Sequence, residues 1–445
     1  MVGLRDGLVS VLSLGLVLGL GFVSGCAAKS EAPAAPADDA QAKAASDNPA
    51  SEEPAANDRQ AALLAELEQQ LEDEPENGAI LYVLARVAAR QSDLDQALDL
   101  LERLAALSQW DHPLDPDDFA PLADNERFTA VVAALRARAP AVTHGAVAME
   151  LDQIDLLPEG VSWDPKRGEL LVGSMYRRQI FAADRQGHLR EVIPAKAGGV
   201  LGVLGMDVDV ERDQIWVAAN GAPFIPGLDS DEATTAGIWG FDLETGEPVG
   251  SHKATREGAM LNDLVVLSDG AVVVTDSANS TLLVRRPGAA ELEELFPPSS
   301  FRAPNGIAEA DEPGILYMAD FSGLHRIDIN KRERLALAAP EGVATLGGID
   351  GLDRQGDTLV GVQNVFTKGR IWAATLASDG RSITAARVLD DAHPRLEGAT
   401  TGVFVGPGVF WYIANAGMQF SPKGLKSIDD DKRHVILEAK LDAEG

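Results

Sequence analysis

The sequence predicts a mainly β fold: a six-bladed β-propeller preceded by a small α-helical segment. The first observation is a repeat in which an apolar strand, a tight turn and a second β-branched strand follow one another, as in 261–277 (LNDLVVLSDGAVVVTDS). It returns about six times at a spacing of roughly 45 residues, the period of four-stranded blades. The copies begin at Pro158, Gly205, Leu261, Pro304, Gly348 and Glu397. The second observation is a strand-like stretch, 146–151, that belongs to no copy and can complete the last blade.

Composition limits the partners of the chain. Of its 445 residues, 45% are hydrophobic, enough for a large core and more than one domain. The formal net charge is -31, from 69 acidic and 38 basic residues. Such a charge repels phosphate backbones and anionic lipid headgroups, so we expect no nucleic-acid partner.

The N-terminal residues 1–25 are predicted to be a lipoprotein signal peptide. Arg5 precedes an apolar run, and the run ends in Val-Ser-Gly before Cys26, the only cysteine. This resembles the lipobox of bacterial lipoproteins, which implies cleavage before Cys26 and lipid attachment to its sulfur. An uncleaved membrane helix is the alternative, but the run is rather short. Ala27 after the cysteine favours the outer membrane, so the expected location is the cell envelope, facing the periplasm and touching the membrane through the lipid alone.

Two different segments separate the signal from the propeller, which is assigned to 141–445. Residues 26–57 are rich in Ala, Pro, Asp, Glu and Ser and are predicted to be a disordered tether. Residues 58–140 show helical spacing. Within them, 80–107 resembles one tetratricopeptide repeat, and 118–135 resembles a capping helix. One repeat is fewer than an array needs, so either a protein-binding segment or a helical spacer fits the pattern.

Polar side chains recur at the entrance of the first strand of each copy. In a propeller this strand lines the central channel, so these residues converge although they are far apart in sequence. The entrance residues with oxygen ligands are Glu159, Asn262, Asn305 and Asp350. Carboxylate and amide oxygens suit a hard cation, above all calcium, whereas zinc requires His or Cys. The alternative is that these residues only form the turns where strands begin.

A second polar set stands where the second strand of each copy ends. Antiparallel order places it on the same face as the entrance residues. Its members are Ser174, Asn220, Asp276, Asp320, Asn364 and Asn415. Two long interruptions of the repeat, 221–237 and 416–433, follow such strands and should overhang the same channel mouth.

Three phrases of the repeat resemble a known family. They are Pro-Asn-Gly-Ile around Asn305, Leu-Asn-Asp around Asn262 and Asp-Gly at Asp350. They are similar to phrases of the calcium-dependent six-bladed propellers of the gluconolactonase and regucalcin (SMP-30) group. The resemblance implies that Glu159, Asn305 and Asp350 bind Ca²⁺ or another divalent cation, that Asp350 is the general base, and that Asn262 contacts the substrate. It implies hydrolysis of a small lactone or ester.

The sequence also departs from that family. Where the gluconolactonase branch has an arginine for sugar-acid recognition, this chain has Met260. No Gly-x-Ser-x-Gly phrase is present, and lipidation would occupy the only cysteine, so no nucleophilic catalyst is expected. Two readings therefore stay open: a metal-dependent lactonase or esterase, and a non-catalytic propeller that binds a ligand or protein partner at the envelope.

Overall fold

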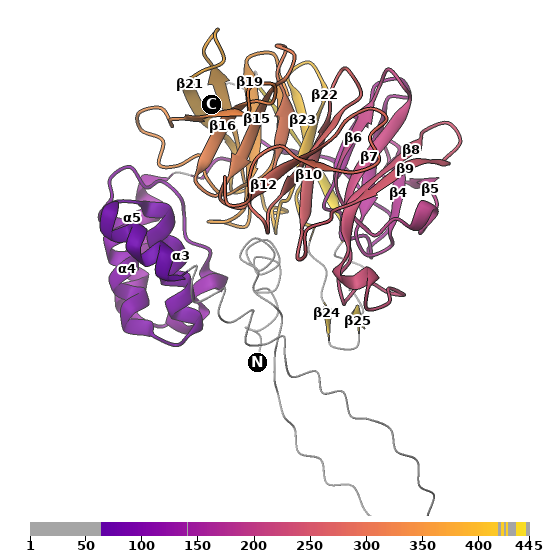
Figure 1. Ribbon diagram of the computed structural model, residues 1–445. Helices are drawn as coiled ribbons and strands as arrows, with labels where there is room; N and C mark the ends of the chain where they lie inside the picture. The colour runs from indigo at the N-terminus through magenta and orange to yellow at the C-terminus, as the bar shows by residue number, and fades with distance from the viewer. Residues whose placement is uncertain (1–63, 140, 417–419, 422–423, 426–432, 442–445) are drawn as a thin grey trace, which may run out of the picture.

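The computed structural model describes residues 64–139, 141–416, 420–421, 424–425 and 433–441. The predicted signal peptide, Cys26 and the predicted tether lie outside the described residues. A ring of sheets with a helical layer beside it makes up the described chain (Figure 1). None of the described helices is long and apolar enough to cross a membrane.

The first three blades are four-stranded antiparallel sheets built from consecutive strands. Their strands are β2 (Val161–Asp164), β3 (Glu169–Ser174), β4 (Gln179–Ala183) and β5 (Leu189–Ile193); β6 (Gly202–Asp209), β7 (Gln214–Asn220), β8 (Ala236–Asp242) and β9 (Pro248–Lys253); and β10 (Leu261–Val266), β11 (Val272–Asp276), β12 (Thr281–Arg285) and β13 (Glu293–Glu294). Short hairpin turns set their register. In the turn between β10 and β11, Gly270 adopts a φ of 85°, which favours glycine, and Asp269 accepts a hydrogen bond from the Ala271 amide.

The fourth and fifth blades follow the same order. They contain β14 (Ile307–Glu309), β15 (Ile315–Asp320), β16 (Gly323–Asp328) and β17 (Glu333–Leu337), then β18 (Ile349–Gln355), β19 (Thr358–Gln363), β20 (Arg370–Leu376) and β21 (Ile383–Asp390). Apolar side chains of adjacent blades pack face to face. Between blades three and four, for example, Val265 and Val273 share a buried cluster with Ile307 and Met318.

The sixth blade joins the two ends of the propeller. It contains β22 (Gly402–Gly406), β23 (Val409–Ile413), β26 (Val435–Lys440) and, as its outermost strand, β1 (Ala146–Glu150). Met149 pairs with Ile436 in this antiparallel closure. The predicted six blades and the predicted use of the leftover strand are therefore confirmed. Within the loop between β23 and β26, two short strands also pair as a small ribbon, β24 (Phe420–Ser421) with β25 (Gly424–Leu425).

The helical layer begins with a helix over 64–73 and continues with three further helical elements and a short 3-10 segment. These are α3 (Gly78–Arg90), α4 (Leu94–Ala106), η1 (Pro116–Leu122) and α5 (Glu126–Arg138). Two other short 3-10 turns, η2 (Ala197–Gly199) and η3 (Glu232–Thr234), lie in loops of the propeller. Asn77, Asp93 and Asn125 cap α3, α4 and α5 by accepting hydrogen bonds from the first-turn amides. The single helix expected over 118–135 is wrong, because Pro121 and the Asn125 cap divide it into η1 and α5.

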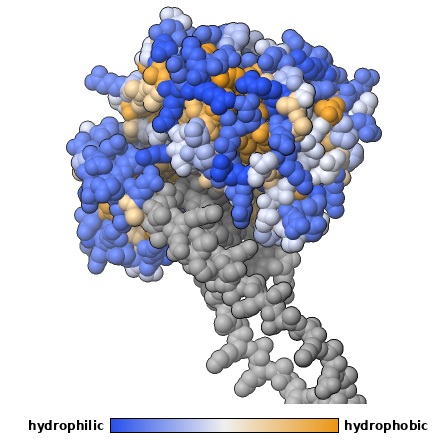
Figure 2. Space-filling model, viewed as in Figure 1, coloured by the Kyte–Doolittle hydropathy of each residue, from blue (hydrophilic) through white to orange (hydrophobic). Residues whose placement is uncertain are grey.

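The helical layer packs on the propeller through its own core. Phe366, from the loop between β19 and β20, packs against Tyr82, Trp110 and His112. Figure 1 shows the helices beside the face from which β24 and β25 project. The outward surface of the helices is mainly hydrophilic (Figure 2), as the strong acidic surplus leads one to expect. The inward face therefore supplies the apolar contact that holds the helices on blade five.

Candidate functional site

The channel mouth is formed where the innermost strands begin. Glu159 precedes β2, Asn262 lies in β10, Asn305 precedes β14 and Asp350 lies in β18. The innermost strands of neighbouring blades contact one another around the whole ring. The four residues predicted from the repeat therefore stand at the same end of one channel.

Asp350 is held by two carboxamides. The Nδ2 group of Asn305 donates to Oδ1 of Asp350 at 2.8 Å, and that of Asn364 donates to Oδ2 at 2.6 Å. Asn364 also donates to the carbonyl oxygen of Ala399 in blade six, at 2.9 Å. Both asparagines are buried, with 7% of their surface exposed, so their positions are set by the blades and they fix the carboxylate between them.

Glu159 and Asp350 form an acidic pair at the mouth. Burial raises the pKa of Asp350, while the hydrogen bonds from Asn364 and Asn305 lower it in part. Burial raises the pKa of Glu159 as well, and the charge of Asp350 raises it further. No described lysine or arginine is among the causes of either shift. Two carboxylates in a poorly hydrated place without a cation disfavour each other's charge, and a bound cation would relieve this.

Asn262 belongs to blade three, two blades away from both members of that pair. Its Nδ2 group donates to Ser277 Oγ at 3.2 Å, and Ser277 Oγ donates to the Pro304 carbonyl oxygen at 2.6 Å. Among the hydrogen bonds of the described residues, none joins Asn262 to Asp350 or Glu159. The structure therefore links Asn262, through Ser277, to the backbone next to Asn305.

The donor set fits a calcium ion in charge and in atom type. Glu159 and Asp350 bring carboxylate oxygens, and Asn305 brings an amide oxygen. Within the described ranges, no three His, Cys, Asp or Glu side chains meet in a group that could hold a metal ion. The protein would thus supply few ligands, and water or substrate would have to provide the others.

Of the second polar set, only Asn364 reaches the acidic pair. The others brace the backbone: Asn220, for example, bonds both the amide and the carbonyl of Leu261 in the next blade, and Asp276 accepts from the Met260 amide. Ser174, Asp320 and Asn415 likewise bond nearby backbone groups. For these residues a structural role explains the side chain fully.

Three further carboxylates on the innermost strands were not anticipated. Asp207, Asp263 and Asp353 each accept the amide of the following residue and one amide of the next blade. Burial raises their pKa values, to about 7, about 8 and about 6 respectively. The sequence feature that could have predicted them is the aspartate that recurs on the first strand of three copies of the repeat. These side chains fasten adjacent blades together.

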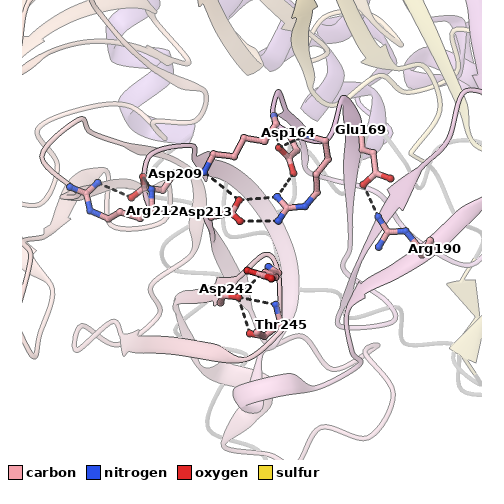
Figure 3. A network of polar contacts seen from close by, with 11 residues as sticks. Asp164, Glu169, Arg190, Asp209, Arg212, Asp213, Asp242 and Thr245 are labelled. Carbon is pink, nitrogen blue, oxygen red and sulfur yellow. Dashed lines mark hydrogen bonds and ion pairs between the residues drawn. The ribbon is translucent and has the colours of Figure 1, made fainter.

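The opposite end of the ring shows carboxylates with a different environment (Figure 3). Arg167 bridges Asp164 at 2.8 Å and Asp213 at 2.8 and 2.9 Å, joining the hairpin turns of blades one and two. The hydrogen bonds from Arg167 lower the pKa of Asp213. Asp209 pairs with Arg212 in the same way. These carboxylates are already neutralised by cations.

Comparisons with known proteins add likenesses of fold. No protein-family model matches the sequence, and no curated protein matches it. An aldose sugar dehydrogenase from Streptomyces coelicolor is 16% identical, with a TM-score of 0.45, over 67% of this chain and 100% of that one. A gluconolactonase from Xanthomonas campestris is 16% identical, with a TM-score of 0.43, over 67% and 94%. A virginiamycin B lyase from Staphylococcus aureus is 14% identical, with a TM-score of 0.43, over 66% and 97%. The chain is thus similar in fold to propellers of three different activities, and its own site must carry any argument on function.

Proposed function

We propose that the propeller is a calcium-dependent hydrolase of a small lactone or ester. The observation that carries the proposal is the acidic pair of Glu159 and Asp350, which is held by amides at the channel mouth and lacks a neighbouring cation among the described residues. Carboxylates with perturbed pKa values are enriched at functional sites.

In this proposal Glu159, Asn305 and Asp350 hold the cation. Calcium bound there would polarise the carbonyl of the substrate as a Lewis acid. Asp350 takes the proton of the attacking water as the water oxygen bonds to the carbonyl carbon. It then returns that proton to the alkoxide oxygen when the carbon–oxygen bond breaks. A carboxylate placed within hydrogen-bond reach of the water can make both transfers.

The other residues of the mouth orient the reactants. Asn364 and Asn305 hold both carboxylate oxygens of Asp350, so the proton acceptor keeps one direction. Asn262 would donate to the substrate from blade three, next to the blade of Asn305. Met260 is buried in place of the arginine that a sugar acid would require, so the preferred substrate carries less polar surface than a sugar lactone.

The proposed setting is the bacterial cell envelope. Cleavage before Cys26 and its lipidation would anchor the mature chain to the outer membrane, and the tether would let the propeller stand away from it. Incorporation of radioactive palmitate into the parent and its loss in Cys26→Ser would support the anchor. Equal labelling of both proteins would contradict it.

Hydrolysis of a panel of lactones and esters tests the activity. The parent should turn over at least one substrate with calcium and lose the activity in a chelator. Asp350→Asn should be slower by about 10²- to 10⁴-fold, the usual contribution of a general base. Asp213→Asn, at the opposite end of the ring, is the matched control and should retain the parent rate. Equal rates for Asp350→Asn and the parent would contradict the proposal.

A second candidate function is partner binding without catalysis. A cavity of about 720 Å³ between the helical layer and blades four and five favours it. Asn77, Arg302 and Thr345 are among its polar lining residues. A folded parent that binds no calcium and hydrolyses no member of the panel would make this the leading function.

A further inference from the structure

The loop that carries Asn364 is enclosed by the helical layer. It spans 364–369, between β19 and β20. We propose that the helical layer is a positioning element for the candidate site: by fixing this loop it places Asn364, and Asn364 orients Asp350. The catalytic part of this inference rests on the proposed function, whereas the coupling between helices and loop does not.

Buried polar contacts hold both ends of the loop. At its start, Nε2 of His112 lies 2.7 Å from Oε1 of Gln363, the residue before Asn364. At its end, Nη2 of Arg370 donates to Asp111 Oδ2 at 2.6 Å, and Nη1 lies 2.9 Å from His112 Nε2. His112, Gln363 and Arg370 are all buried, so losing these contacts would leave polar groups without partners.

The middle of the loop is fixed by a helix and by aromatic packing. Arg86 of α3 donates to the Val365 carbonyl oxygen at 3.2 Å and to Asp118 at 3.1 Å. The Phe366 ring lies 5.5 Å from Tyr82 and 5.4 Å from Trp110 between ring centres, in edge-to-face arrangements. Phe366 and Arg86 have 0% and 1% of their surface exposed. A charge-assisted bond and a closed aromatic cluster therefore define the backbone on the C-terminal side of Asn364.

Asn364 thus lies between two anchored residues, Gln363 and Val365, and its own side chain points the other way. Its Nδ2 group bonds Asp350 at 2.6 Å and the Ala399 carbonyl at 2.9 Å. A shift of the loop would move this amide away from the carboxylate. When a group that hydrogen-bonds a metal ligand, without binding the metal itself, is removed, metal affinity or activity commonly falls by 10- to 100-fold. The helical layer would act on the site in that way, over one peptide bond.

Two variants and a control test the inference in the mature chain. His112→Phe keeps a ring against Trp110 and Phe366 but removes the contact with Gln363. Gln363→Leu removes the same contact from the propeller side. Phe128→Leu is the control, because Phe128 is a buried residue of the helical core whose ring packs on Phe119, not on the loop. The unfolding midpoint of each protein shows whether it is folded at the temperature of the assays.

Two readouts are used: hydrogen exchange of the peptides over 361–369, and calcium affinity by calorimetry. In both loop variants we expect these peptides to exchange faster than in the parent. We also expect the calcium affinity to be weaker than that of the parent by about ten-fold or more. The Phe128→Leu control should show neither change. In kinetic assays, kcat should fall in the loop variants while KM stays near the parent value, because the substrate contacts at Asn262 are untouched.

The outcomes separate this inference from the proposed function. Parent-like exchange and calcium affinity in both folded variants would overturn the inference, as would equal changes in the control. Faster exchange with parent-like affinity would overturn the positioning role. If the parent itself binds no calcium, the proposed function fails, and exchange alone then decides whether the helices hold the loop: faster exchange in the loop variants supports it, and unchanged exchange overturns it.

Discussion

Asp350 at the channel mouth and Asp213 at the opposite end of the ring are both aspartates, but their environments differ. Asp213 receives two hydrogen bonds from Arg167, which lower its pKa. Asp350 receives its hydrogen bonds from neutral amides and has the acidic Glu159 near it, and burial raises its pKa. The opposite end thus pairs its carboxylates with arginines, whereas no described lysine or arginine pairs with the two mouth carboxylates, which is the basis for proposing a cation there.

The carboxylates of the innermost strands qualify this comparison. Asp207 and Asp263 have raised pKa values although their oxygens accept strand amides from two blades. A raised pKa therefore does not identify a site by itself. The mouth is distinguished by two carboxylates close enough for the charge of one to raise the pKa of the other, and by the side-chain amides that hold one of them.

The largest predicted effect is a pH dependence of stability in chelator. The folded pKa values of Asp207 and Asp263, about 7 and about 8, exceed the ordinary value near 4, so the unfolded chain binds fewer protons between about pH 4 and 8. The free energy of unfolding should therefore fall as the pH rises through this window, by on the order of 1 kcal/mol per pH unit for each titrating group. Denaturant unfolding at several pH values measures it.

The double variant Asp207→Asn, Asp263→Asn is the control for that dependence. It cannot ionise at these positions, so its free energy of unfolding should change less with pH between 4 and 8. A parent whose stability rises steadily from pH 5 to pH 8 in chelator would contradict this account of the innermost strands.

A smaller loss of stability is expected at the opposite end. Asp164→Ala removes the carboxylate that accepts the amides of Lys166 and Arg167 and the Arg167 guanidinium. Because Asp164 is buried, unfolding should become easier by about 2 kcal/mol. Calcium affinity should stay at the parent value. A weakened calcium affinity at unchanged stability would show that the two ends are not independent.

The smallest predicted effect is a gain of stability at the mouth. Glu159→Gln removes one of two carboxylates that disfavour each other, so in chelator the variant should be more stable than the parent by about 1 kcal/mol. With calcium present the order should reverse, since the parent binds the ion more tightly and gains more stability from it. Thermal unfolding with and without calcium decides this. A variant that is less stable than the parent in chelator would mean that Glu159 serves the fold.

The repeat made the ring predictable, because its period sets the blade and its phase sets which residues enter the channel. The leftover strand at 146–151 made the closure predictable as well. The same phase placed Asn305 and Asp350 in neighbouring blades, where they bond each other. The repeat could not predict that Asn364, and not Asn220, reaches the candidate site, because both residues stand at the end of a second strand. Only the fold shows that Asn364 bonds Asp350 whereas Asn220 bonds the backbone.

The link between helices and loop had no sequence signal. His112 and Gln363 are 251 positions apart. His112 belongs to the helical layer and Gln363 to the propeller repeat, so no shared sequence pattern connects them. Their contact arises from how the helical layer packs on blade five. Spacing within a segment predicts that segment, but contacts between differently built segments depend on packing in three dimensions.

Calcium titration by calorimetry tests the central claim most directly. The mature parent and Asp213→Asn should each bind one calcium ion with a dissociation constant on the order of micromolar. Glu159→Gln and Asp350→Asn, which each remove one negative charge from the mouth, should bind at least about 100-fold more weakly. Equal binding by all four proteins, or no binding by the parent, would contradict the claim that the two mouth carboxylates form a cation site.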